Sequence, residues 1–465
     1  MAHPDQTGGP VSTPTGTLGT DAPLSVAPAP SGEPAFDDHR PPSAALVADC
    51  VHCGFCLPTC PTYALWGQEM DSPRGRIYLM SEGLEGEPMT PAMVEHFDAC
   101  LGCMACVTAC PSGVQYDKLI EATRAQIERR HDRPRSQRLL RAAIFAVFPY
   151  PRRLHALRLP LKAYQRSGAQ KLLRRSGLLD RLSPTLATME SVAPRVEDGV
   201  RLPALVSARG PRRAVVGMLT GCVQREFFPG VNAATVRVLS AEGCDVVVPR
   251  SQGCCGALSV HNGRRAEAQA FARSLIDTFD QAEVEHVVVN SAGCGSAMKE
   301  YGELLADDPA YAERAERFGA KVRDITELLV ELGPVAPRHP VPVVLAYHDA
   351  CHLAHAQGVR AAPRTLLNGV PGVQVREIAE GGMCCGSAGV YNLINPGPAR
   401  ELGDRKAKNV VATAADLLVT ANPGCLLQVT DALRRNGTSI ATAHTVEVLD
   451  ASLRGVGPAH LLDRA

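Results

Sequence analysis

Residues 49–63, DCVHCGFCLPTCPTY, decide the architecture of the N-terminal part of this chain of 465 residues. The segment places cysteines at positions 50, 53, 56 and 60, with a proline directly after the last. Residues 99–113, ACLGCMACVTACPSG, repeat this spacing with cysteines at 100, 103, 106 and 110. Closely spaced cysteines in a reducing compartment are typical metal ligands, so the two runs indicate a pair of metal-binding loops.

Each run has the pattern C-x2-C-x2-C-x3-C-P, which is typical of bacterial ferredoxins with two 4Fe-4S clusters. Three cysteines at these intervals wrap one cluster, and the fourth, turned away by the proline, ligates the other. Zinc is the alternative metal, but structural zinc sites usually take two well-separated ligand pairs. The spacing therefore predicts one cluster on Cys50, Cys53, Cys56 and Cys110, and a second on Cys100, Cys103, Cys106 and Cys60.

The C-terminal half contains a duplication, which eight further cysteines reveal. The segments MLTGC, QGCCG and VVVNSAGC in the first copy correspond to VVLAYHDAC, GGMCCG and LLVTANPGC in the second. Matched cysteines are 129, 130, 130 and 131 residues apart, and such constant offsets indicate an internal repeat. The first copy contains Cys222, Cys254, Cys255 and Cys294, and the second contains Cys351, Cys384, Cys385 and Cys425.

Both copies alternate short apolar runs with helical stretches, which predicts α/β units with largely parallel strands. Cys222, Cys294, Cys351 and Cys425 follow predicted strands, at the edge where open α/β sheets bind their ligands. We therefore expect the thiols of each copy to converge. The glycines beside the CCG pairs, Gly253, Gly256, Gly382 and Gly386, would let backbone N–H groups approach sulfur. Cys244 has no counterpart in the second copy and is expected in the core.

Composition divides the chain into five segments. Residues 1–40, rich in Pro, Gly and Thr, predict a disordered tail, and residues 41–120 form the ferredoxin-type domain. Residues 121–205 predict a basic helical linker, which Pro134, Pro149, Pro151 and Pro160 break into short helices. The two copies of the duplication occupy residues 206–335 and 336–455. The predicted fold class is thus α+β and multidomain, with a helical domain followed by two duplicated α/β domains.

Positive and negative side chains are equal in number over the whole chain, but they are unevenly distributed along the sequence. Residues 121–182 contain sixteen Lys or Arg against four Asp or Glu. This stretch is either a solvated linker, a docking face for an acidic partner, or an amphipathic helix on anionic lipid, for which residues 138–159 have the right pattern. Nucleic acid is disfavoured, since aromatic residues are 4% of the chain and no nucleic-acid module is present.

The chain has no transmembrane-length apolar run and no secretory signal. The expected location is therefore cytoplasmic, with attachment to the inner face of the cell membrane left open.

With both cysteine systems in view, the sequence resembles the iron–sulfur subunit of glycolate oxidase (glycolate dehydrogenase), in the heterodisulfide reductase-related group of CCG-domain proteins. The resemblance spans residues 40 to 450. It is carried by SPRGRIYLM at 72–80, YHDACHLAHAQGVR at 347–360, MCCGSAGVYN at 383–392 and NPGCLLQ at 422–428.

The resemblance implies two 4Fe-4S clusters in the ferredoxin-type domain and a further iron–sulfur cluster in each CCG domain. The sequence departs from the five-cysteine CCG pattern, because Ser291 and Asn422 stand where one further cysteine would be. Four thiols per copy remain, which suffice for an ordinary 4Fe-4S cluster. Buried structural thiols are the alternative for these eight cysteines.

The resemblance also implies a function, namely the electron-transfer subunit of a flavin-dependent glycolate dehydrogenase. The chain lacks a G-x-G-x-x-G fingerprint, so we expect FAD on a partner subunit that oxidises glycolate to glyoxylate, and no catalytic residue here. Electrons would leave toward a quinone-type acceptor, with His352, beside Cys351, as a candidate relay group.

Two other functions stay open. The first is the iron–sulfur subunit of a lactate-utilisation, glycerol-3-phosphate or heterodisulfide redox complex. The second is a cluster-based sensor without turnover.

Overall fold

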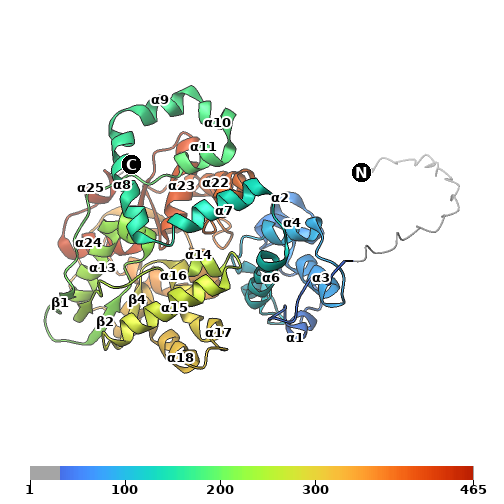
Figure 1. Ribbon diagram of the computed structural model, residues 1–465. Helices are drawn as coiled ribbons and strands as arrows, with labels where there is room; N and C mark the ends of the chain where they lie inside the picture. Colours follow the sequence, from blue (N-terminus) through green and yellow to red (C-terminus); the bar gives the residue numbers. More distant parts are fainter. Residues whose placement is uncertain (1–31, 464–465) are drawn as a thin grey trace, which may run out of the picture. The chain divides into compact units, whose positions relative to one another are not determined.

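The structure is a computed structural model in which residues 32–463 are described (Figure 1). Residues 1–31 of the predicted tail, which comprises residues 1–40, lie outside the described residues. From Glu33 on, the chain packs, since Ala35 is fully buried and Phe36 is 8% exposed, both within the core of the first cysteine-rich segment. The packed part therefore begins earlier than composition predicted, because two apolar side chains dock there.

The ferredoxin-type segment is helical. Prolines begin three of its helices, α2 (Pro61–Trp66), α3 (Pro73–Leu84) and α4 (Pro91–Ala99), where the missing N–H costs nothing. Ser72 and Thr90 cap α3 and α4 by accepting hydrogen bonds from backbone N–H groups. The remaining helices are α1 (Ala44–Ala48), η1 (Glu69–Asp71), α5 (Ala105–Ala109) and α6 (Tyr116–Arg130).

The basic linker forms five helices: α7 (Arg135–Val147), α8 (Pro151–Arg166), α9 (Ala169–Ser176), α10 (Leu178–Leu182) and α11 (Pro184–Ser191). Pro134 and Pro151 stand at helix starts and Pro149 lies between helices, as expected. The prediction for Pro160 was wrong, because this residue lies inside α8. Pro160 and Ala156 are both exposed, so water can satisfy the carbonyl that the proline leaves without a donor.

Two parallel sheets form the duplicated half. The first has the order β1-β3-β2-β4-β5, and only β1 pairs antiparallel. The second has the order β7-β6-β8-β9, which repeats β3-β2-β4-β5 of the first. The strands are β1 (Leu205–Val206), β2 (Ala214–Met218), β3 (Cys244–Val247), β4 (His286–Val289), β5 (Val322–Asp324), β6 (Val343–Tyr347), β7 (Val373–Glu377), β8 (Leu417–Thr420) and β9 (Ala441–His444).

Helices cover both sheets. In the first module, which we define as residues 206–335, they are α12 (Cys222–Phe227), α13 (Pro229–Ala241), α14 (Ala257–Val260), α15 (Arg265–Asp280), α16 (Ala292–Lys299), α17 (Tyr301–Leu304), α18 (Ala312–Lys321) and α19 (Ile325–Leu332). In the second module, residues 336–455, they are η2 (His352–Ala356), α20 (Ala361–Asn368), α21 (Tyr391–Ile394), α22 (Pro396–Val411), α23 (Pro423–Arg435) and α24 (Thr445–Arg454), and α25 (Ala459–Leu462) follows. The predicted fold class, including the duplication, is confirmed.

The two modules share one apolar core. Val216 and Val246 of the first sheet and Leu345 and Val419 of the second belong to the same buried cluster. Cys244 is fully buried in this cluster, which confirms its expected place in the core. The guanidinium of Arg237 on α13 also donates two 2.7 Å hydrogen bonds to Asp450 on α24. This packing holds the modules in a fixed relation, so that loops of both can line one site.

Candidate iron–sulfur sites

Each cysteine run of the ferredoxin-type segment folds into a tight loop around a small hollow. The loops need left-handed backbone, which Gly54 provides at φ +86° and Gly102 at φ +61°. A side chain at Gly54 would also meet the guanidinium of Arg74 at 2.8 Å. The hollow of the first loop is lined by Cys50, Cys53, Cys56, Cys110 and Cys106. The hollow of the second is lined by Cys60, Cys100, Cys103 and Cys106.

The fourth cysteine of each run therefore lies beside the other run. Cys60 precedes α2 and Cys110 follows α5, so the backbone turns both away from their own loops. Cys106 borders both hollows, which places the two sites next to each other. The arrangement fits the crossed ligand sets that the spacing predicts, and the individual ligand assignments stay predictions.

Two arginine side chains lie beside the cysteines of the second hollow. Arg76 lines it and is 1% exposed, and Arg124 donates a hydrogen bond to the carbonyl of Cys100. Burial raises the pKa of the Cys100 thiol, but the charges of Arg76 and Arg124 and the hydrogen bonds from Gly102 and Tyr116 outweigh it and lower the pKa. These groups favour a thiolate, and hence a metal ligand, at Cys100.

The second hollow adjoins the second module. Cys103 belongs to the same apolar cluster of buried residues as Cys351 and Cys384. The hydroxyl of Thr108 on α5 lies 2.7 Å from Nδ1 of His355, whose Nε2 lies 2.8 Å from the carbonyl of Gly382. The ferredoxin-type segment thus contacts His355 of η2, and His355 in turn contacts the loop that carries the second CCG pair.

Within each module the four thiols lie next to one another in the order in which they occur in the sequence. The Sγ atoms of Cys222 and Cys254 lie 3.8 Å apart. Hydrogen bonds with Cys222 and Cys255 raise the pKa of Cys254, and the hydrogen bond from Cys254 lowers the pKa of Cys255, which also contacts Cys294. The second module repeats this order from Cys351 through Cys384 and Cys385 to Cys425.

Local structure explains why these thiols converge. Cys222 is the first residue of α12, and Cys294 and Cys425 lie in the first turns of α16 and α23, so each of these sulfurs lies at a helix start that closely follows a strand. The glycines after the CCG pairs adopt φ of +80° at Gly256 and +88° at Gly386. The N–H of Gly256 donates to Sγ of Cys254 at 3.3 Å, as the glycine pattern led us to expect.

The two departures from the five-cysteine pattern meet at the module boundary. The hydroxyl of Ser291 donates to Oδ1 of Asn422 at 3.4 Å. The amide of Asn422 donates to Sγ of Cys425 at 3.5 Å. The hydrogen bond with Cys255 and burial raise the pKa of Cys294, and the neighbouring Ser291 offsets only a small part of this rise. Asn422 thus supplies a hydrogen-bond donor to Cys425, and Ser291 orients the Asn422 amide, at the positions where the wider pattern has a fifth thiolate.

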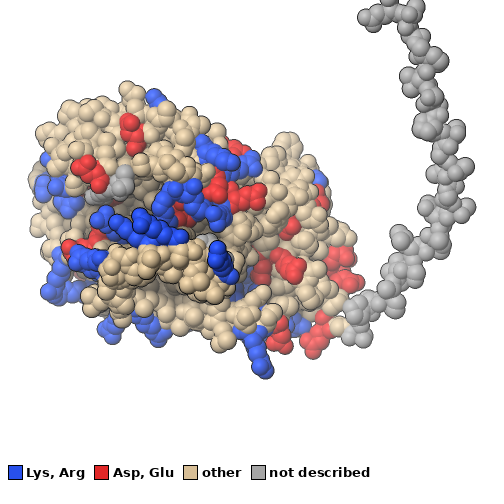
Figure 2. All heavy atoms as spheres, turned by 90° about the horizontal axis from the view of Figure 1, so that it is seen from above, with Lys and Arg blue, Asp and Glu red and all other residues tan. Residues whose placement is uncertain are grey.

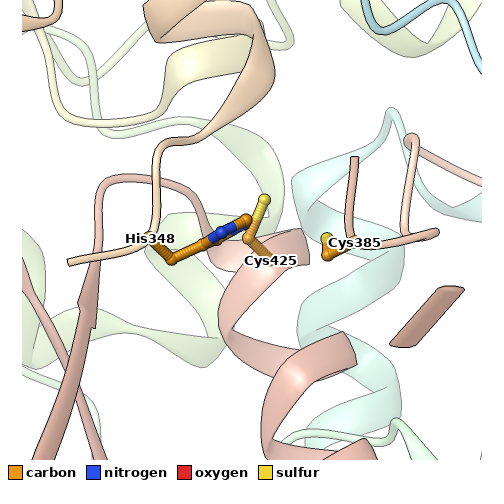
Figure 3. A group of neighbouring side chains, drawn as sticks. All are labelled: His348, Cys385 and Cys425. Carbon is orange, nitrogen blue, oxygen red and sulfur yellow. The ribbon is translucent and has the colours of Figure 1, made fainter. Parts of the chain in front are cut away.

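His348 is a candidate ligand that the motif analysis did not single out. Its ring and the sulfurs of Cys385 and Cys425 lie within 4.8 Å of one another (Figure 3). Both ring nitrogens are buried and lack a hydrogen-bond partner among the described residues. The sequence offers one signal, since the corresponding position of the first copy is the apolar Leu219.

The two thiol sets open into one cavity, which we call the inter-module cavity. Its volume is about 360 Å³. Helices α8 and α11 of the linker close it on one side with Leu154, Leu157, Leu161, Met189 and Val192. The cysteines that line it are Cys222, Cys254, Cys255, Cys294, Cys351, Cys384, Cys385 and Cys425.

The outer face of the linker is both basic and apolar. Figure 2, which views the molecule from the side of α9–α11, shows Lys and Arg side chains gathered along a hollow of this face. The large apolar side chains exposed between positions 139 and 186 are Leu139, Leu157, Leu159, Leu172, Leu178, Leu182 and Leu186. In residues 32–463, no helix combines the length and the apolar character needed to span a bilayer.

Comparison with known families matches three parts of the chain. A family model described as "Glycolate oxidase iron-sulfur subunit, linker region" matches residues 136–193. A cysteine-rich domain, CCG, matches residues 216–299 and again residues 345–430. A 4Fe-4S dicluster domain matches residues 46–114, which supports iron–sulfur binding over zinc at the paired cysteine runs.

Similar curated proteins cover nearly the whole chain. The probable glycolate oxidase iron-sulfur subunit of Bacillus subtilis is 39% identical over 88% of this chain and 94% of its own length. The glycolate oxidase iron-sulfur subunit of Escherichia coli is 36% identical over 90% of this chain and 98% of its own. Lactate utilization protein A of an Exiguobacterium species is 32% identical but covers 51% of this chain.

Proposed function

The chain belongs to the glycolate oxidase iron-sulfur subunit family, and on that premise we propose that it serves a flavin-dependent complex that oxidises glycolate to glyoxylate. Membership makes the chain an iron–sulfur electron-transfer subunit of an oxidoreductase. In the proposed reaction glycolate loses two electrons and two protons, and a quinone-type acceptor gains the same number. FAD on a partner subunit takes the hydride, because this chain has no dinucleotide fingerprint.

The cysteine sets supply what single-electron transfer needs. The proposed ligands are Cys50, Cys53, Cys56 and Cys110 for one 4Fe-4S cluster, Cys100, Cys103, Cys106 and Cys60 for a second, and the four thiols of each module for one further cluster. Bound there, such clusters accept and release electrons one at a time, which connects a two-electron flavin donor to the acceptor.

The observation that best supports this function is the shared apolar cluster of Cys103, Cys351 and Cys384. It brings a buried thiol of the ferredoxin-type segment close to buried thiols of the second module. His355 supports the same contact as a neutral side chain, since burial lowers its pKa and Nε2 faces the carbonyl of Gly382. A fixed contact between buried side chains suits electron transfer between the two cysteine systems.

The linker face supports a peripheral contact with the cell membrane, where quinones reside. Exposed leucines such as Leu159, at 77%, and Leu172, at 73%, stand among the basic side chains of α8 and α9. Apolar side chains framed by Lys and Arg match an anionic lipid surface. The inter-module cavity lies directly beneath α8.

A lactate-utilisation role is the second candidate, because lactate utilization proteins also match. Their similarity covers about half of this chain, whereas the glycolate oxidase subunits match the linker as well. The test is anaerobic purification together with the flavoprotein encoded nearest to this chain. We expect reduction of a quinone analogue with glycolate. Reduction with lactate alone, or no flavoprotein bound, would contradict the proposal.

A further inference from the structure

The inter-module cavity contains a buried amide for which the proposed clusters give no role. Gln224 on α12 lines the cavity and is 3% exposed. Neither its Nε2 nor its Oε1 has a hydrogen-bond partner in the part of the chain that the structure describes. Each buried donor or acceptor left unpaired costs about 1–3 kcal/mol. An amide kept at this cost indicates a ligand that pairs with it.

The second module contributes a matching polar group. His352 also lines the cavity, and its Nε2 is buried without a partner within residues 32–463. Its Nδ1 lies 3.6 Å from Sγ of Cys351, so Nε2 is the ring atom left for a ligand. An imidazole nitrogen can donate to a carbonyl oxygen or accept from a hydroxyl, depending on its protonation.

Comparison of the two modules shows that Gln224 and His352 are not part of the cysteine pattern that both modules share. At the offset of 129 residues that relates Cys222 to Cys351, the counterpart of Gln224 is Leu353. The counterpart of His352 is Val223 by the same offset. At these two pairs of positions one module therefore has a polar side chain where its copy has an apolar one, as is also the case for His348 and Leu219. Holding a cluster does not require either residue, since each module has four thiols without it.

The rest of the cavity selects an apolar ligand. Its walls between the modules and the linker include Leu154, Leu161, Phe227 and Leu393. Leu157 lines the cavity and is also 47% exposed, so the cavity reaches the surface beside α8. The described residues that line it include no Lys or Arg, which disfavours a carboxylate such as a 2-hydroxy acid. The volume of about 360 Å³ includes the space between the thiols that the proposed clusters would occupy, so a further ligand would take the part of the cavity that borders α8 and α11.

We propose that the inter-module cavity binds the ring of a quinone, with Gln224 and His352 as its two polar contacts. A quinone ring is apolar and has two oxygen atoms, which matches one polar side chain from each module. The amide N–H of Gln224 donates to one oxygen, and Nε2 of His352 contacts the other. The apolar tail leaves along Leu157 toward the linker face. This inference rests on the proposed function and adds the place where its acceptor binds.

Binding of ubiquinone-1, a short-tailed quinone, to the oxidised, cluster-loaded protein tests the proposal. Equilibrium dialysis under anaerobic conditions gives the Kd. We expect Gln224→Leu and His352→Val, which introduce the residue of the other module, each to raise the Kd about tenfold, as the loss of one hydrogen bond does. Gln224→Met, closer in size, should do the same. Gln68→Leu, at an exposed position, should leave the Kd unchanged.

The possible results test the quinone site and the proposed function separately. If wild-type protein does not bind ubiquinone-1, or if glycolate displaces it, the proposal is wrong. If Gln224→Leu changes the paramagnetic resonance of a cluster but not the Kd, its amide serves the cluster and the quinone site is refuted. A complex that reduces a quinone analogue with glycolate, but in which Gln224→Leu and His352→Val leave the Kd of ubiquinone-1 unchanged, keeps the proposed function and overturns this inference. A complex that binds ubiquinone-1 but does not oxidise glycolate does the reverse.

Discussion

Replacing Arg76 with glutamine should lower the reduction potential of one ferredoxin-type cluster. Arg76 belongs to the SPRGR motif and is 1% exposed beside the second cysteine hollow. Its Nε donates to the carbonyl of His96 at 2.6 Å, and its Nη2 donates to Asp71 at 3.4 Å. The charges of Cys100, Tyr116, Cys60 and Asp71 raise its pKa despite burial, so the guanidinium stays charged.

A buried positive charge stabilises the reduced cluster, which carries one more electron. At about 8 Å and an effective dielectric constant of about 20, a unit charge is worth roughly 2 kcal/mol. For a one-electron couple this corresponds to roughly 90 mV. Because the Asp71 carboxylate is present in both proteins, its charge does not enter the difference, and we expect a decrease of roughly 90 mV.

Redox titration followed by paramagnetic resonance measures this shift, with iron content as the check on cluster loading. Arg76→Lys keeps the charge and should shift the potential much less. Arg129→Gln is the control, because Arg129 lines neither cysteine hollow, is 36% exposed and is already paired with Asp37 at 2.9 Å. An unchanged or higher potential in fully loaded Arg76→Gln protein would refute the electrostatic role.

Three further predictions follow from single sites. Cys53→Ser should remove about half of the ferredoxin-type iron and most electron flow to an acceptor dye, whereas unchanged iron would contradict the ligand assignment. Gly386→Ala should lower the free energy of unfolding, measured in denaturant, by about 2–4 kcal/mol, because φ is +88° and the new Cβ would meet the Ala399 carbonyl at 2.5 Å. Gly397→Ala should lower it little, because a Cβ at Gly397 would meet nothing within 4 Å. Equal losses in the two variants would contradict the packing argument. Burial and the charges of Glu121 and Asp117 raise the pKa of Glu300 from 4.5 to about 8. The folded state therefore holds a proton that the unfolded state has released between these values, and the Tm should fall as pH rises through that window. Glu300→Gln should make the Tm depend less on pH in this window, whereas Glu401→Gln, at an exposed position, should not. If the Tm of Glu300→Gln fell with pH in parallel with that of the wild type, the raised pKa of Glu300 would be contradicted.

The sequence predicted what depends on short spacing and repetition. The cysteine runs are local, and their hollows form with Cys60 and Cys110 crossed as the spacing implies. The constant offsets of the duplicated cysteines predicted two α/β modules, which the repeated strand order confirms. These features follow from the few backbone paths that closely spaced ligands and parallel strands allow.

Features that depend on long-range packing could not be read in advance. The contact of Cys103 with Cys351 joins residues from different domains, and the inter-module cavity needs the linker as its wall. Nothing local distinguishes Gln224 from a surface glutamine, and the comparison with Leu353 becomes informative only once both line one cavity. Pro160 was misjudged because the rule that proline ends a helix fails where the freed carbonyl reaches water.

The central claim is that the chain's thiols hold iron–sulfur clusters from the ferredoxin-type hollows to the inter-module cavity. Iron and sulfide analysis with Mössbauer spectroscopy, on protein purified without oxygen, tests it most directly. The account predicts about sixteen iron atoms per chain in 4Fe-4S form, about half of them retained when the eight module cysteines are replaced by serine. A colourless protein with bound zinc, or iron in the ferredoxin-type sites alone, would contradict it.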